Sequence, residues 1–274
     1  MAYLLGFLGL AAVVAVSLSL VTSGPGGNNK STETEILLDR ATSLGISPFT
    51  PALALGPRPA RASEALVKAL PKRLARGDQV GLYDGRRGHT SCDVQGLVRS
   101  LTQNPGPGQA WADAENISYN DLATFIGRLT PVLLRADTRV TNYSYGGQPT
   151  PHHSVLEAGT AVLVDAFGIP RARCYGGNPL VPPVAVRSKT VYGGPRWPTF
   201  DAKAVIAVIG AAQPVSRFVL IDVTTKKSFL RPAGSNGTAD GDYVPAAPAP
   251  APAAPTTATP PKPPTPTTPT TRHR

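Results

Sequence analysis

Residues 132–145 read VLLRADTRVTNYSY, and this stretch decides which fold the chain can adopt. Apolar and polar side chains alternate along it, which is the period of an extended strand with one buried face. Gly146-Gly147 follows and can turn the chain back on itself. The stretch therefore predicts a long strand at the start of a β-sheet region.

The chain that follows repeats the signals of strands. TAVLVD at 160–165 and IPRARC at 169–174 flank Gly168, which predicts a hairpin with the glycine in its turn. Two later apolar runs, at 204–209 and 217–223, predict buried strands.

The chain that precedes the long strand has helical periodicity instead. Apolar residues at helical spacing predict an amphipathic helix over 93–103, a second over 108–116 and a third from Ser118. Ser63 can cap a further short helix. Helices followed by strands predict an α+β fold, in which a small helical layer packs on a mainly antiparallel sheet.

The first residues of the chain form an apolar run. Residues 2–21 read AYLLGFLGLAAVVAVSLSLV, a length that as a helix spans about 30 Å, the thickness of a bilayer core. The run predicts a retained single-pass transmembrane helix. A cleaved signal peptide is the alternative, because small residues follow near position 23, although no A-x-A cleavage pattern is present.

The other end of the chain cannot contribute to a packed core. Proline accounts for 11 of the 30 residues from 245 to 274, and proline removes backbone donors from helices and sheets. A disordered, extended tail is expected. The predicted organisation is an anchor (1–23), a juxtamembrane linker with a short helix (24–77), an extracytoplasmic α+β domain (78–230) and a Pro/Thr/Ala-rich disordered tail (231–274).

The chain has a formal net charge of +10, but the charge is dispersed. Nucleic-acid binding would require a basic stripe with interleaved aromatic side chains, and the densest central basic pair is Arg86-Arg87. The excess favours weak attraction to anionic lipid or cell-wall polymers and argues against a nucleic-acid partner.

Cys92 and Cys174 are the two cysteines of the chain. An even count in an exported chain predicts a disulfide, which closes a loop whose chain-entropy contribution is about 4 kcal/mol. A catalytic cysteine at Cys92, which can open a helix, stays as an alternative. A zinc site is disfavoured because neither cysteine belongs to a C-x-x-C pair.

The string LTPVLLRADTRVTN at 129–142, together with five others, resembles an actinobacterial family known as domain of unknown function 6777. The resemblance implies a membrane or envelope protein with one anchor and supplies no activity. Many members read R-C-x-C-G-N-P-L, whereas Gly176 stands here in place of the second cysteine, which leaves Cys92 and Cys174 as the pair. The strings that carry it are GLYDG at 81–85, SCDV at 91–94, LTPVLLRADTRVTN at 129–142, SVLEAGTAVLVD at 154–165, RCYGGNPL at 173–180 and W-P-x-F-D at 197–201.

The candidate binding residues lie in the long strand itself. Arg135, Asp137 and Arg139 have i, i+2 spacing, so a regular strand would project all three from one face, with Asn142 on the other. Two guanidinium groups beside an acid could grip a carboxylate or phosphate. A structural ion-pair network is the other interpretation of the same residues.

The sequence contains no nucleophile elbow, phosphate-binding loop or dinucleotide fingerprint, and it implies no cofactor or metal. We therefore expect a non-enzymatic binding or sensing module of the cell envelope, on the extracytoplasmic side of the cell membrane. Its partner would be the membrane and an envelope protein or cell-wall glycan. The alternative is an extracytoplasmic hydrolase that uses His152, His153, Asp137 and Asp165, which requires these groups to converge in one pocket.

Overall fold

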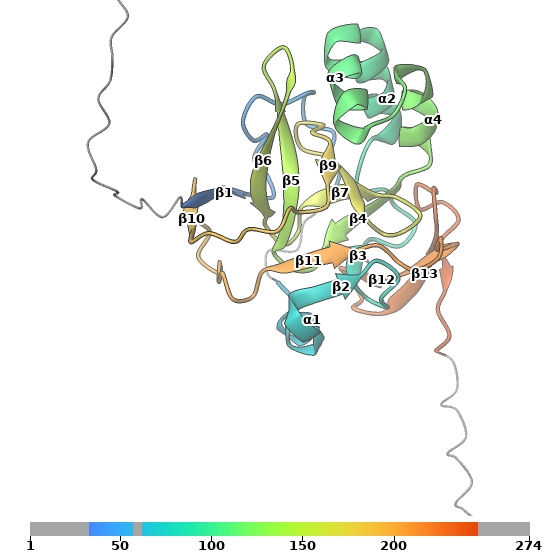
Figure 1. Ribbon diagram of the computed structural model, residues 1–274. Coiled ribbons are helices and arrows are strands. Elements are labelled where there is room, and N and C mark those ends of the chain that lie inside the picture. Colours follow the sequence, from blue (N-terminus) through green and yellow to red (C-terminus); the bar gives the residue numbers. More distant parts are fainter. Residues whose placement is uncertain (1–32, 57–61, 246–274) are drawn as a thin grey trace, which may run out of the picture.

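The computed structural model describes residues 33–56 and 62–245 (Figure 1). The apolar run at 2–21 and the tail from residue 246 onward lie outside these ranges. Among the residues that the structure describes, no helix is both long and apolar enough to cross a membrane. The fold is α+β, as expected, but its strands form two sheets instead of one.

The first sheet has the strand order β10-β1-β6-β5-β11-β2, with β9 paired to β5. Its central hairpin, β5 with β6, is antiparallel. In contrast, β1 runs parallel to both β6 and β10, and β11 runs parallel to both β5 and β2. The strands are β1 (Thr34–Asp39), β2 (Leu74–Arg76), β5 (Thr138–Tyr145), β6 (Pro149–Leu156), β9 (Leu180–Val181), β10 (Thr190–Gly193) and β11 (Ile206–Ile209).

The second sheet has the order β14-β13-β12-β3-β4-β7-β8. It is antiparallel except between β12 and β3. The predicted hairpin is confirmed: β7 pairs with β8, and Gly168 occupies the turn with a φ of 73°. The strands are β3 (Tyr83–Gly85), β4 (Thr130–Leu134), β7 (Ala161–Val164), β8 (Pro170–Arg173), β12 (Arg217–Asp222), β13 (Ser228–Pro232) and β14 (Gly241–Asp242).

The main core lies between the two sheets. Val140, Leu156 and Ile206 from the first sheet share one cluster with Val162 and Leu220 from the second. All five are buried, and the burial of apolar area contributes most of the free energy that holds the sheets together. The short helix α1 (Glu64–Ala69) closes this cluster with two of its own apolar residues, and a 3₁₀ turn (Pro71–Arg73) links it to β2.

Three helices form a separate layer at one end of the molecule (Figure 1). Leu97, Trp111 and Ile126, one from each helix, are fully buried against Leu133 and Leu163 of the second sheet. The predicted helical layer is therefore confirmed, and Trp111 is buried within it. The helices are α2 (Val94–Gln103), α3 (Pro105–Glu115) and α4 (Leu122–Gly127), with a 3₁₀ turn (Tyr119–Asp121) before α4.

Residues 132–145 do not form one strand, which corrects the expectation. The chain leaves β4 at Leu134 and enters β5 at Thr138, and these strands belong to different sheets. The crossing point is fixed by buried hydrogen bonds: Asp137 accepts the backbone N–H of Ala158 at 2.9 Å and the indole N–H of Trp197 at 3.0 Å. The alternation of apolar and polar residues does not reveal this break between two strands, because the polar residue at the break, Asp137, is itself buried and hydrogen-bonded.

The fold begins earlier in the chain than the boundary expected at residue 78. The strand β1 lies inside the first sheet, because it has β10 on one side and β6 on the other. The chain between β1 and Leu55 is also part of the folded body, where Phe49 packs against the helical layer. At the other end, β13 and β14 extend the second sheet past residue 230.

Candidate functional site

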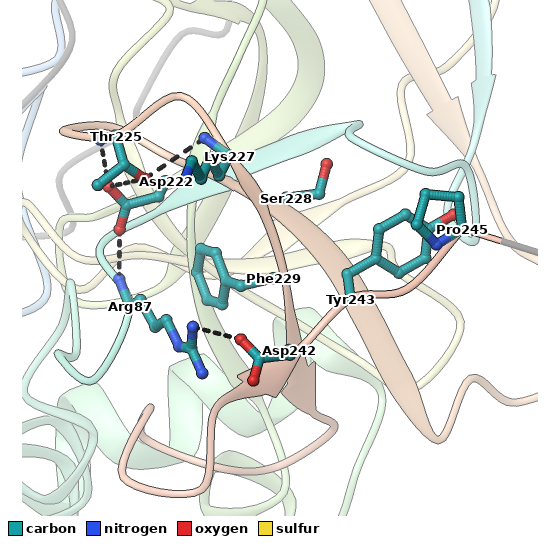
Figure 2. Close-up of a pocket in the computed structure, with 9 residues that line it drawn as sticks. All are labelled: Arg87, Asp222, Thr225, Lys227, Ser228, Phe229, Asp242, Tyr243 and Pro245. Carbon is teal, nitrogen blue, oxygen red and sulfur yellow. Dashed lines mark hydrogen bonds and ion pairs between the residues drawn. The ribbon is translucent and has the colours of Figure 1, made fainter.

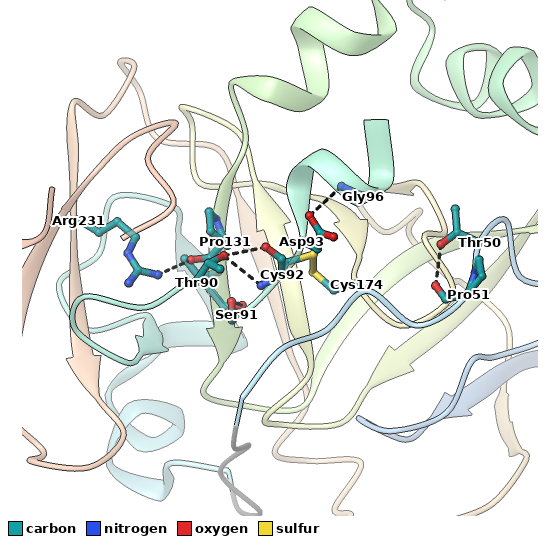
Figure 3. Close-up of a disulfide and its surroundings, with 11 residues drawn as sticks. Thr50, Pro51, Thr90, Ser91, Cys92, Asp93, Gly96, Pro131, Cys174 and Arg231 are labelled. Atoms are coloured by element: carbon teal, nitrogen blue, oxygen red, sulfur yellow. Dashed lines mark hydrogen bonds between the residues drawn. A yellow bond between two sulfur atoms is a disulfide. The ribbon is translucent and has the colours of Figure 1, made fainter. Parts of the chain in front are cut away.

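The predicted disulfide is present. Cys92 and Cys174 are bonded, with their Cα atoms 5.7 Å apart, and both side chains are buried. The bond joins Cys92, two residues before α2, to Cys174, which directly follows β8, and thus the helical layer to the second sheet. Leu53 lies beside both cysteines: its N–H donates to the carbonyl of Cys174, and its own carbonyl accepts the N–H of Asp93, each at 2.8 Å. Figure 3 shows this junction.

Two pockets of about 360 and 390 Å³ lie next to one another beside the disulfide. They share Leu55, Thr90, Asn236 and Thr238, so together they form one groove with two lobes. We call it the disulfide groove. Its first lobe is lined in addition by Cys92, Asp93, Val94, Gln95, Gly127, Leu129, Gly234 and Ser235, and its second by Gly56, Arg86, Gly88, His89, Ser91 and Leu133.

One wall of the groove is the chain that leads into α2, residues 86–95, and the other is the loop at 234–238. The disulfide and the helix cap fix the α2 end of the first wall. Asp93 caps α2 by accepting the N–H of Gly96 at 2.8 Å, which satisfies one of the free donors of the helix start. The groove is therefore bounded by backbone that tertiary bonds hold in place.

A buried guanidinium group ties the two walls together. Arg231 of β13 donates to the carbonyl oxygens of Arg86 and His89 in the first wall, at 3.1 and 2.8 Å. It also pairs with Asp240, which follows the second wall, through two hydrogen bonds of 2.9 and 2.7 Å. Its remaining donor, Nη1, reaches the carbonyl of Pro131 (Figure 3). Because the hydrogen bonds of Arg231 join both walls, the two walls are held in place before any ligand binds.

The groups that face the groove can bind a polar ligand. The guanidinium group of Arg86 has no hydrogen-bond or ion-pair partner within the described part of the chain. The Oγ of Ser235 is buried and lacks a partner there as well. Leu55, Leu129 and Val94 supply apolar surface beside these groups. Among the described lining residues, the groove thus combines the unpaired guanidinium group of Arg86 with apolar wall, and no nucleophile lies beside a base. The Ser235 hydroxyl is buried beneath this surface.

A third pocket of about 490 Å³ lies where β12 turns into β13 (Figure 2). Its polar groups are mostly occupied by one another. Asp222 accepts backbone N–H groups from Arg87, Thr224 and Thr225 at 2.7 to 2.9 Å, and Arg87 pairs with Asp242 at 2.7 Å. We therefore place the candidate site in the disulfide groove, where the guanidinium group of Arg86 has no partner within the described chain.

The structure does not bring the four candidate binding residues together. Arg135 pairs with Asp84 at 2.8 Å and donates to the carbonyl of Gly81. Asp137 is occupied by the two buried hydrogen bonds described above, and burial raises its pKa. Both residues lie in the connection between β4 and β5, so the shared sheet face expected for them does not form.

The other two candidates lie in β5. Arg139 donates to the carbonyl of Val184 at 2.5 Å, on the outer side of the first sheet. Asn142 is buried and donates to Asp39 at 3.1 Å. Each of the four candidates therefore has its own structural partner, and none of them lines the disulfide groove.

The residues of the hydrolase interpretation also have separate places. His152 lies opposite Asn142 on β6, and burial lowers its pKa against the opposing effect of Asp39. Asp165 closes the β7–β8 turn by accepting the N–H groups of Phe167 and Ile169. Within the described ranges no group of three His, Cys, Asp or Glu side chains could hold a metal ion.

Outside the groove, a buried acid lies beneath the helical layer. Glu115 ends α3 and pairs with Arg171 at 3.1 Å, and Arg171 also pairs with Asp165 at 2.8 Å. Burial raises the pKa of Glu115 to about 8 despite the opposing charge of Arg171. Burial likewise raises the pKa of Asp84 to about 6, although Arg135 lies beside it. These acids stabilise the fold most when they are protonated.

The sequence did not single out Arg231 and Asp240, which organise the groove. Asn236-Gly237 between them is typical of a turn and indicates that the two residues lie near each other. Gly237 in this turn has a φ of 101°, and a side chain there would collide with the carbonyl of His89. No residue pattern indicates that the arginine before the turn is buried.

The family model of a domain of unknown function (DUF6777) matches residues 73–234, which is more than half of the chain. No curated protein and no solved structure matched in the corresponding searches. The matched range contains the first wall of the groove, both cysteines and Arg231, whereas Leu55 and Asp240 fall outside it.

Proposed function

We propose that this chain, which belongs to the DUF6777 family, is a membrane-tethered extracytoplasmic module that binds an extended segment of another envelope protein in its disulfide groove. The observation that carries the proposal is the preorganised groove: two connected lobes whose walls are fixed by the disulfide at one end and by Arg231 at the other. Binding to fixed walls avoids the entropy of ordering loops.

The lining of the groove favours a peptide over a glycan. No aromatic side chain lines either lobe, and aromatic faces are a common platform for ring ligands. The second lobe carries the unpaired charge of Arg86, whereas Asp93 in the first lobe already pairs with Arg99 at 3.4 Å and caps α2. An extended chain with an acidic residue near one end matches this charge. Leu55 and Leu129 can contact its apolar side chains.

The tether and the location rest on the sequence and on the redox chemistry. Residues 2–21 have the length and composition of a membrane anchor. A structural disulfide is typical of compartments outside the cytosol. The described chain begins at β1 on one side of the molecule and ends after β14 on another side (Figure 1).

Location is tested by fractionation of cells that express the full chain. A retained anchor keeps the protein in the membrane pellet after carbonate extraction, and the intact mass includes residues 1–23. A soluble product that begins near Gly24 would show a cleaved signal peptide and would remove the tether from the proposal.

Groove binding is tested with the purified full chain in detergent and a fluorescent library of short synthetic peptides of varied charge. We expect peptides with an acidic residue near one end to bind most tightly. Arg86→Ala should weaken them about tenfold or more, as expected for loss of a charged hydrogen bond. Thr90→Trp, which fills the junction of the lobes, should abolish binding. Arg187→Ala, an exposed arginine outside the groove, is the matched control. Binding that Thr90→Trp leaves intact would place the site elsewhere.

A further inference from the structure

Three large apolar side chains are exposed together where β2 lies beside β11. Leu74, Ile209 and Phe167 are 42%, 46% and 41% exposed. Backbone bonds connect their segments: Gly77 donates to the carbonyl of Ile209, and Ala211 donates to that of Phe167, each at 2.9 Å. Exposed apolar residues that occur singly need no explanation, but a contiguous group marks a contact surface.

The strand geometry explains why Leu74 and Ile209 point outward. Ala75 and Val208 pair with each other and are buried in the core between the sheets. Because alternate residues of a strand face opposite sides, the neighbours of these two must face away from the core. No helix or strand packs on this outer face among the described elements (Figure 1).

Cations surround the apolar residues. Lys72 and Arg73 directly precede β2, and the Nε of Arg73 donates to the carbonyl of Lys203 at 3.0 Å. A pocket of about 360 Å³ is lined by the cations Lys68, Arg73 and Lys203 and by the acids Glu64 and Asp201. Within the described chain, Lys68 is paired with Glu64, whereas Lys72, Arg73 and Lys203 form no ion pair. The surface is therefore both apolar and basic.

The turn that presents two of these cations has a strained backbone. Lys72 and Arg73 have φ values of 52° and 57°, so two consecutive residues with side chains occupy the left-handed region. This conformation is unfavourable for residues other than glycine and persists only where surrounding contacts impose it. Arg73 supplies those contacts through the carbonyls of Lys203 and Val67. The fold thus maintains a costly turn directly before Leu74, the first residue of β2.

We propose that this face, the β2 surface, rests on an anionic lipid bilayer. We define the β2 surface as Lys72, Arg73, Leu74, Phe167, Lys203 and Ile209. The inference rests on the proposed tether, which keeps the domain close to the membrane. Apolar side chains enter the interfacial layer, while lysine and arginine pair with lipid phosphates.

The charges favour a membrane over a second copy of the chain. In a two-fold dimer the same patch faces itself, so the cations Lys72, Arg73 and Lys203 of both copies would be brought into one interface. Like charges brought together at an interface are unfavourable. An anionic bilayer supplies the opposite charge over an area as wide as the surface.

The test uses the full chain in lipid nanodiscs made with phosphatidylglycerol or with phosphatidylcholine alone, followed by hydrogen exchange. We expect residues 70–78 and 203–211 to exchange at least about fivefold more slowly in the anionic discs, and high salt should remove the difference. The double variant Lys72→Glu/Lys203→Glu should abolish the protection, and Leu74→Ser/Ile209→Ser should reduce it. Arg187→Glu and Val184→Ser, exposed elsewhere, are the matched controls and should leave it unchanged.

Equal exchange in the two kinds of disc would overturn the inference, and so would protection that survives the charge reversal. Glycerol phosphate added to phosphatidylcholine discs separates a bilayer from a free phosphate: equal protection by the soluble probe would exclude the membrane as the ligand. If the chain fails to insert into nanodiscs, the proposed tether is wrong. Flotation of the same chain with phosphatidylglycerol vesicles then tests whether the β2 surface binds an anionic bilayer without the tether. Absence of flotation would refute it.

Discussion

Arg231 and Asp240 form an ion pair that is closed to solvent, with side chains 0% and 1% exposed and two hydrogen bonds of 2.9 and 2.7 Å between them. Nearby, Arg87 and Asp242 form a pair of similar length whose side chains are 47% and 81% exposed. The two pairs differ chiefly in burial. This contrast makes the role of the buried pair measurable.

Asp240→Ala should destabilise the domain by about 3–5 kcal/mol, because it leaves the guanidinium group of Arg231 buried without a counter-charge. Asp242→Ala removes the exposed pair and should cost less than about 1 kcal/mol. Urea denaturation of both variants measures the difference. Similar values for the two would mean that Arg231 gains its stability from the carbonyl oxygens alone.

The disulfide should contribute strongly to stability. Cys92→Ser should lower the free energy of unfolding by about 2–5 kcal/mol, because an uncrosslinked unfolded chain has more conformational freedom. The variant also frees Cys174, so the double variant with Cys174→Ser is its control and should lose a similar amount. Unfolded but unreduced wild-type protein should show no free thiol. Two reactive thiols in freshly isolated protein would contradict both the bond and the location.

Stability should decrease as pH rises from about 6.5 to 8. The folded-state pKa of Glu115, about 8, is higher than its ordinary value of 4.5, so between these values the folded state binds more protons than the unfolded state. Unfolding free energy then falls with pH, by at most about 1.4 kcal/mol per pH unit for one group. Above pH 6.5 the lowered pKa of His152 no longer opposes this trend.

Chemical denaturation at several pH values measures this slope. Glu115→Gln keeps the shape of the side chain and removes its titration, so the variant should flatten the dependence. Glu64→Gln changes an exposed glutamate and should leave the slope unchanged. A slope that persists in Glu115→Gln would assign the dependence to another group.

The family match and the folded unit have different boundaries, and this can be tested by truncation. Residues 73–234 alone lack β1, α1, Leu55 and Asp240, so they should fail to give a cooperative thermal transition. Residues 33–245 should give one. Removal of the tail from residue 246 onward should shift the melting temperature of the full chain by less than about two degrees, because its composition cannot bury enough apolar area. Thermal unfolding followed by circular dichroism distinguishes these outcomes.

Local sequence signals predicted the parts of the fold that local chemistry determines. The β7–β8 hairpin depends on Gly168, and α2 begins at Asp93, whose side chain caps it. The disulfide could be predicted because the chain offers only one pairing. Such features need no knowledge of distant contacts.

Features set by distant partners could not be predicted in the same way. The break at Asp137 depends on Trp197, sixty residues further along the chain. The alternation around it is the same whether the strand continues or crosses to another sheet. Arg231 is buried because carbonyl oxygens from residues 86, 89 and 131 converge on it, and its own neighbours give no sign of this. The disulfide groove could not be predicted from the sequence for the same reason, because its walls come from distant segments.

The position of β1 determines when the first sheet can form during synthesis. β1 emerges from the ribosome first, but its partners β6 and β10 begin at Pro149 and Thr190. Until those residues are made, both edges of β1 are unpaired, and an apolar strand with free edges is prone to aggregation. Pairing over such long sequence separations is also slow. The first sheet therefore cannot close before the chain has been made as far as β11, Ile206–Ile209.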